Sequence, residues 1–145
     1  MTVTCTRRIQ FCAGHRLLNH LGECANLHGH NYVALFTAEA GCLDEVGRVM
    51  DFAALKIRLG GWIEKYWDHA FIYYQEDDAA KNAVSLFAEQ AGATKAFAAP
   101  WNPTAEAMAN HLLRVVAPKV LRGIDVTICR VQLWETENCY AEAKL

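Results

Sequence analysis

The amino-acid sequence predicts an α+β fold in which helices pack on one face of an antiparallel sheet. Strand-like segments lie near both ends of the chain, apolar residues recur at helical spacing in the middle, and turn-forming residues separate them. The expected order is β-β-α-α-β-β. The chain has 145 residues and contains no repeat or linker-like stretch, so residues 1–145 are expected to form a single domain.

Four segments have the composition of β-strands. Residues 3–12 and 31–38 are the first two, and they are separated by a loop over residues 17–27 that contains glycine and asparagine. Residues 125–134 and 139–144 are the last two. The first two strands can form a hairpin, although a long loop separates them.

The first long helix is expected to begin after Asp51, which has a side chain suited to an N-cap. Gly60 and Gly61 lie inside it and each costs about 1 kcal/mol relative to alanine, so a bend or tight packing is expected there. The apolar residues at helical spacing are Phe52, Leu55, Leu59, Trp62, Ile63 and Tyr66.

A shorter helix is expected over residues 82–91, and a third helical segment after Asn102. Asn102 is predicted to be the N-cap, with Pro103 at the first helical position. Pro118 marks the approach of its end. The apolar face consists of Ala105, Met108, Ala109, Leu112, Leu113 and Val116.

Composition and charge exclude several classes of function. A formal net charge of -2 gives no basic excess for binding nucleic acid. No window approaches the roughly 20 apolar residues of a membrane-spanning helix. Residues 1–8 lack the apolar core of a signal peptide, so the six cysteines are expected to be reduced and the protein cytoplasmic.

Three histidines form the strongest functional signal. His28 and His30 flank Gly29 at the start of a predicted strand, where residues two apart point to the same face. His15 ends the preceding strand and can meet them if the two strands pair. Three histidines with an open coordination position are typical of catalytic zinc, which polarises a bound oxygen.

Cys24 lies within the same window, and two interpretations of it remain open. It can be a fourth ligand that closes a structural zinc site, or it can be a nucleophile or base beside the metal. The second is favoured because structural zinc sites usually contain more cysteines.

Four further polar residues are candidates for chemistry or binding. Asp68 and His69 join a carboxylate to an imidazole suited to proton transfer. Glu106 lies in the first turn of a predicted helix. Glu135 ends an apolar strand, where a carboxylate can accept two N–H groups from a guanidine-like edge.

Several motifs occur together in one order: Phe-Cys-Ala-Gly-His-Arg at residues 11–16, Cys24 followed by His-Gly-His-Asn-Tyr at residues 28–32, and Val-Met-Asp-Phe at residues 49–52. They are followed by Asp68-His69, Asn-Pro-Thr-Ala-Glu at residues 102–106 and Trp-Glu-Thr at residues 134–136. From about residue 5 to residue 143 the chain resembles the 6-pyruvoyl-tetrahydropterin synthase family, and most closely its bacterial 6-carboxy-5,6,7,8-tetrahydropterin synthase branch of queuosine (7-deazaguanine) biosynthesis.

The resemblance implies a tunnelling fold (T-fold), in which trimers close a barrel and two trimers stack as a homohexamer with active sites between subunits. It implies that Zn²⁺ binds the three histidines, that Cys24 is the catalytic thiol, and that Asp68 and His69 are its relay partners. It also implies that Glu135 anchors the pterin, with Thr104 and Glu106 as further pocket residues.

The implied reaction converts the small molecule 7,8-dihydroneopterin triphosphate to 6-carboxy-tetrahydropterin, acetaldehyde and triphosphate. Pyruvoyl-type synthesis from the same substrate and a non-catalytic zinc-stabilised module remain the alternatives. Glu23 can share the role of Cys24, and residues 71–101 are expected to add a helix and an outer loop. Candidate triphosphate contacts are Arg7, Arg8, Arg16 and Lys56.

Overall fold

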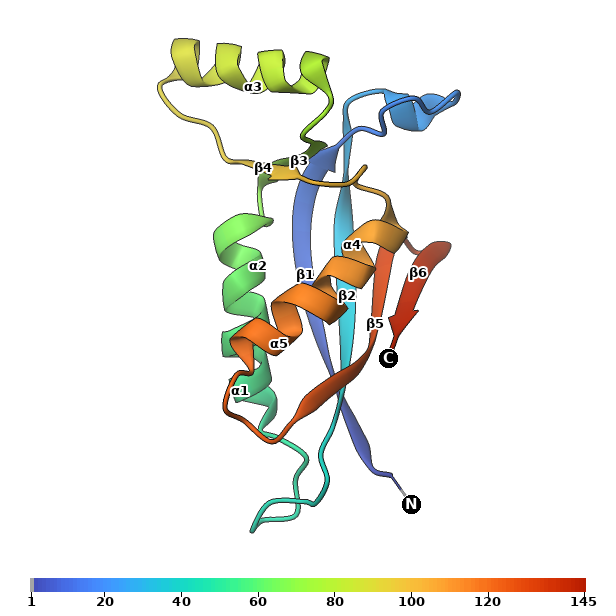
Figure 1. Ribbon diagram of the computed structural model, residues 1–145, viewed down its shortest axis with the longest axis vertical. Coiled ribbons are helices and arrows are strands. Elements are labelled where there is room, and N and C mark those ends of the chain that lie inside the picture. The colour runs from blue at the N-terminus through green and yellow to red at the C-terminus, as the bar shows by residue number, and fades with distance from the viewer. Residues whose placement is uncertain (1) are drawn as a thin grey trace.

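A computed structural model describes residues 2–145 and has at its centre a six-stranded sheet in the order β4-β3-β1-β2-β5-β6 (Figure 1). The strands are β1 (Thr4–His15), β2 (His28–Glu39), β3 (Ala70–Tyr74), β4 (Ala96–Ala99), β5 (Thr127–Thr136) and β6 (Cys139–Lys144). The helical segments are η1 (Glu23–Ala25), α1 (Phe52–Leu55), η2 (Lys56–Gly60), α2 (Gly61–Tyr66), α3 (Asp78–Ala91), α4 (Ala105–His111), η3 (Leu112–Val116) and α5 (Ala117–Val120).

The four predicted strands are confirmed as β1, β2, β5 and β6, and within this set each strand is antiparallel to the one beside it. β1 and β2 pair along their whole length, from Thr4 opposite Glu39 to His15 opposite His28. The α1–α2 and α4–α5 stretches lie against one face of this sheet, as the α+β prediction requires (Figure 1). The core lies between these helices and the sheet and includes Phe36, Leu59 and Leu112, each 0% exposed.

The prediction of a purely antiparallel sheet was wrong, because β3 and β4 were missed. β3 pairs parallel to the end of β1, over Ala13–His15, and β4 pairs parallel to β3. Both strands are short, and their sequences, Ala-Phe-Ile-Tyr-Tyr and Ala-Phe-Ala-Ala, lack the alternation that marks a half-buried strand. The sheet is therefore mixed at this edge.

The first helical stretch is confirmed and begins as expected after Asp51, whose carboxylate accepts the N–H groups of Ala53 and Ala54. The irregularity expected at Gly60 and Gly61 takes the form of one π-helical turn, η2. A Cβ at Gly60 would lie 3.6 Å from the Ile9 side chain of β1, an ordinary contact, so the turn packs against the sheet without requiring a glycine there.

The start of α4 differs from the prediction. Thr104, not Asn102, is the N-cap, because its hydroxyl accepts the N–H of Ala107. The amide of Asn102 instead accepts the N–H of Leu18 and donates to the carbonyl of Leu18, both at 2.9 Å. Asn102 therefore fastens the 16–27 loop to the segment that enters α4.

The 71–101 segment contains the expected helix, α3, which extends away from the rest of the molecule (Figure 1). Instead of an outer loop alone, the segment also contributes β3 and β4. Asp77 caps α3 by accepting the N–H of Ala80, and its other oxygen lies 2.7 Å from Nε of Arg16. No helix within residues 2–145 is both long and apolar enough to cross a membrane.

Asp77 is only 1% exposed, so the Asp77→Ala substitution removes a cap and leaves the Arg16 guanidinium without its anion. We expect the free energy of unfolding to fall by about 2–3 kcal/mol, measured by urea denaturation followed by circular dichroism. Asp78→Ala, at the neighbouring exposed position, is the control. Equal losses in the two variants would contradict the role of Asp77.

Candidate metal centre

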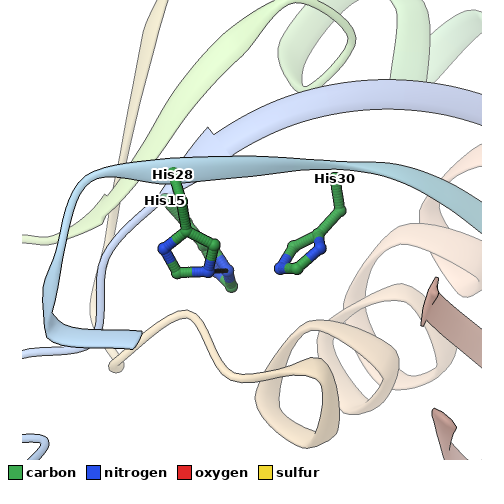
Figure 2. A group of neighbouring side chains, drawn as sticks. All are labelled: His15, His28 and His30. Carbon is green, nitrogen blue, oxygen red and sulfur yellow. Dashed lines mark hydrogen bonds between the residues drawn. The ribbon is translucent and has the colours of Figure 1, made fainter. Parts of the chain in front are cut away.

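Three imidazoles converge from two paired strands. His15 is the last residue of β1, and His28 and His30 are the first and third residues of β2. Their ligand-competent atoms all lie within 4.8 Å of one another. Figure 2 shows the three rings on the same side of the β1–β2 pair. The structure therefore brings together the three histidines that the sequence predicts as metal ligands.

Gly29 lets the strands approach at this point. It lies opposite Gly14 in the β1–β2 register, and a Cβ placed on it would be 2.9 Å from the backbone oxygen of Ala13. That oxygen is part of the strand and cannot move away cheaply. The side chains of His28 and His30 consequently sit at the separation set by an undistorted, tightly paired β1–β2 ladder.

Backbone carbonyls orient two of the rings. His15 Nδ1 donates to the carbonyl of Pro103 at 2.8 Å, and His28 Nδ1 donates to the carbonyl of Asn26 at 2.7 Å. These contacts assign the proton of each neutral ring to Nδ1 and leave Nε2 as a lone pair. The two Nε2 atoms are 3.0 Å apart (Figure 2).

Burial disfavours the charged forms of His15 and His30. Burial first, and then the neighbouring His28 and His30, lower the pKa of His15 to about 4, against the raising effect of the Pro103 carbonyl. Burial also lowers the pKa of His30, partly opposed by Glu135. Tyr32, whose hydroxyl lies 3.2 Å from His15 Nδ1, has a pKa raised by burial and stays protonated.

These residues fit a metal ion. Two lone pairs that face each other at 3.0 Å repel unless a cation lies between them, and Nε2 of His30 is buried without a hydrogen-bond partner. Zinc–nitrogen bonds of 2.0–2.1 Å in tetrahedral geometry separate ligand nitrogens by about 3.3 Å. His15, His28 and His30 would hold such an ion through Nε2 and leave a fourth position open.

Glu135 lies beside the cluster on β5. Its two carboxylate oxygens are 3.9 Å from His15 Nε2 and 4.0 Å from His30 Nε2. A β-bulge between Trp134 and Thr136 removes Glu135 from the ladder with β6. The carboxylate is partly exposed, so it can bind a ligand that reaches the open side of the cluster.

Cys24 lies in η1, where its carbonyl accepts the N–H of Leu17. Its sulfur does not join the three histidines, whose donor atoms all lie within 4.8 Å of one another.

Thr104 uses its hydroxyl to cap α4, and Glu106 is exposed in the first turn of that helix. The structure therefore gives Thr104 a structural role, and it places neither Thr104 nor Glu106 in the histidine cluster.

Asp68 and His69 contact each other, although adjacent residues need not do so. His69 has a positive φ of 61°, which brings its Nδ1 to 3.0 Å from Asp68 Oδ2. Burial opposes ionisation of Asp68, but the Cys12 N–H, the His69 ring and Lys95 together lower its pKa.

The pair does not join the three-histidine cluster of the same chain. Its donor atoms lie instead within 4.8 Å of the sulfur of Cys12 on β1, a residue that was not predicted to belong to a site. The only sequence signal was a thiol in the strand that carries His15.

The chain belongs to the 6-pyruvoyl tetrahydropterin synthase family, whose model matches residues 4–145. A Rickettsia bellii relative named 6-carboxy-5,6,7,8-tetrahydropterin synthase is 37% identical over 140 residues, which cover 97% of this chain and 99% of the relative. An Aquifex aeolicus relative with the same name is 38% identical over 128 residues, covering 86% and 77%.

Solved structures agree on the fold. A Wolinella succinogenes protein superposes with a TM-score of 0.84 at 22% identity, covering 99% of this chain and 98% of its own. The 6-pyruvoyl tetrahydropterin synthase of Caenorhabditis elegans has a TM-score of 0.69 at 24% identity, covering 100% and 96%. The T-fold predicted from the resemblance is thereby confirmed.

The His28→Ala substitution should lower the affinity for Zn²⁺ by at least about 100-fold, because one of three ligands and its fixed lone pair are lost. Competition with a chromophoric chelator measures this affinity. His20→Ala is the matched control, since His20 is exposed in the adjoining loop and lies outside the cluster. Equal losses in both variants would show that the cluster is not the metal centre.

Proposed function

We propose that the protein is a zinc-dependent carbon–carbon lyase. It converts 7,8-dihydroneopterin triphosphate and water to 6-carboxy-5,6,7,8-tetrahydropterin, acetaldehyde and triphosphate, in queuosine biosynthesis. The observation that carries the proposal is the convergence of three imidazole nitrogens beside a carboxylate. The names of the relatives at 37–38% identity favour the carboxy product over the pyruvoyl product.

The zinc ion, when bound, supplies a Lewis acid that polarises an oxygen of the substrate side chain and acidifies the adjoining C–H bond. His15, His28 and His30 would hold the ion, and backbone carbonyls orient the rings of His15 and His28 by accepting their Nδ1 protons. Glu135 binds the 2-amino and N3 edge of the pterin as a two-oxygen acceptor. This contact directs the side chain of the substrate towards the open coordination position.

Cys24 accepts and returns protons on the substrate side chain, with Asp68 and His69 as the relay. The Asp68 carboxylate, 3.0 Å from His69 Nδ1, holds the His69 ring in place for proton transfer. Thr104 and Glu106 are the further proposed pocket residues, and the Thr104 hydroxyl also caps α4. Arg16 is paired with Asp77, which leaves Arg7, Arg8 and Lys56 as the stronger candidates for the triphosphate.

The sheet edges support a ring-shaped assembly. Within residues 2–145, β3 covers β1 only over Ala13–His15, and β6 forms the opposite edge. β6 runs antiparallel to β1, so pairing β6 of one copy with β1 of the next continues the antiparallel order and removes both edges. Asp68 and His69 form hydrogen bonds with the backbone of Cys12 at this edge of β1, so they would then face the adjoining copy.

We propose a homohexamer of two such trimers. Light scattering should give about six times the chain mass of 16.2 kDa. A monodisperse monomer would contradict the assembly and the shared site together.

The proposed reaction is tested by incubating zinc-loaded protein with 7,8-dihydroneopterin triphosphate and identifying the products by mass spectrometry. We expect 6-carboxy-tetrahydropterin and acetaldehyde. The pyruvoyl product would assign the sister activity. No turnover by a zinc-loaded hexamer would refute the lyase proposal.

Cys24→Ala should reduce kcat by about 10²–10⁴-fold, because the proton-transfer group is lost while the three zinc ligands remain. Cys42→Ala, at an exposed loop position, is the matched control. Bound zinc is measured by elemental analysis in both variants. Loss of zinc in Cys24→Ala would instead make Cys24 a ligand of a structural site.

A further inference from the structure

Cys12, Asp68 and His69 form a second cluster of metal-ligating side chains, and their donor atoms all lie within 4.8 Å of one another. The Cys12 sulfur is 3.9 Å from Asp68 Oδ1, and Asp68 Oδ2 is 3.0 Å from His69 Nδ1. Zinc bonds of 2.3 Å to sulfur and about 2.1 Å to oxygen in tetrahedral geometry separate these ligands by about 3.6 Å. Small side-chain rotations therefore bring all three donors onto one ion.

The backbone fixes this cluster in place. Asp68 Oδ1 accepts the N–H of Cys12 at 3.0 Å, and the carbonyl of Cys12 accepts the N–H of His69 at 2.7 Å. Both polar groups of one strand residue are thus bonded to the dipeptide that provides the other two donors. The left-handed backbone conformation of His69, with φ at 61°, turns the ring back towards Asp68.

The cluster is distinct from the three-histidine centre. Cys12 and His15 are three residues apart on β1, so their side chains leave opposite faces of the strand. On the Cys12 face, the paired Gly14 and Gly29 carry no side chains, and a surface hollow there is lined by Cys12, Asn31 and His69. His28 and His30 also line the hollow but Asp68 does not, so the hollow gives an ion access to Cys12 and His69.

The charges match a divalent cation. A thiolate and a carboxylate together neutralise two positive charges, and the imidazole adds a neutral ligand. Lys95 donates to the carbonyls of Glu64 and Asp68, which holds the segment while its charge favours ionised Asp68. A sulfur ligand selects zinc-like metals over magnesium or calcium.

We propose that Cys12, Asp68 and His69 form a second site for a thiophilic divalent cation such as Zn²⁺, separate from the three-histidine centre. One consequence rests on the proposed function: an ion at this site occupies His69 and Asp68 and removes them from proton transfer. Excess zinc would then inhibit the enzyme after the first equivalent has activated it.

Cobalt provides a test that needs no substrate. Metal-free full-length protein is titrated with Co²⁺ to two equivalents per chain. We expect the second equivalent to produce a near-ultraviolet thiolate-to-cobalt charge-transfer band. Cys12→Ser should abolish this band and weaken binding of the second equivalent at least about tenfold, while the first equivalent binds as before.

Cys24→Ser is the matched control and should keep the band. His69→Ala, which retains every thiol, should weaken the second equivalent as Cys12→Ser does. A band that survives in Cys12→Ser, a band lost in Cys24→Ser, or no thiolate band at two equivalents would overturn the second site. Because the readout is spectroscopic, it stands even if the lyase reaction is not observed.

In an active preparation, excess Zn²⁺ should lower the wild-type rate at least about tenfold, and the ratio of rates with and without excess zinc should approach one in Cys12→Ser. Equal inhibition of both proteins, with the cobalt band present, would overturn the regulatory consequence.

Discussion

The 3.0 Å separation of two imidazole nitrogens is the constraint on which the candidate centre depends. Hydrogen bonds to the carbonyls of Pro103 and Asn26 place both ring protons on the far nitrogens, so two lone pairs face each other. Burial of His15 disfavours relief by protonation. A bound metal ion would replace this repulsion with two coordination bonds. The local fold would therefore be stabilised by the same ion that supplies the chemistry.

Several unrelated segments supply this geometry. The β1–β2 pairing register places His15 opposite His28 and close to His30, and Gly29 permits the close approach of the two strands. Asn102 fixes the segment before α4, so that the Pro103 carbonyl reaches His15. The bulge on β5 frees Glu135 from the ladder beside the same rings. The sheet, the 16–27 loop and the segment before α4 therefore together position the ring nitrogens and the Glu135 carboxylate.

The sequence could predict the parts of the site that follow from strand periodicity. His28 and His30 share a face because they are two residues apart, and antiparallel pairing brings His15 opposite His28. The strands β1, β2, β5 and β6 and the helix capped by Asp51 could be predicted from the sequence for the same reason. Strand and helix periods leave a visible pattern when an element is long and has one buried face.

Other features have no such signature. The carbonyl that orients His15 belongs to a residue 88 positions away, and a backbone oxygen cannot be recognised from residue type. β3 and β4 are too short to show a period. The contact between Asp68 and His69, and hence the cluster with Cys12, depends on a positive φ at a residue that rarely adopts it.

Anomalous diffraction at the zinc edge, from crystals of zinc-loaded protein, tests the central claim most directly. The account predicts one peak bonded to Nε2 of His15, His28 and His30, with the fourth position held by solvent or substrate and no sulfur within bonding distance. A peak bonded to Cys24 as well, or no peak among the three rings, would contradict it.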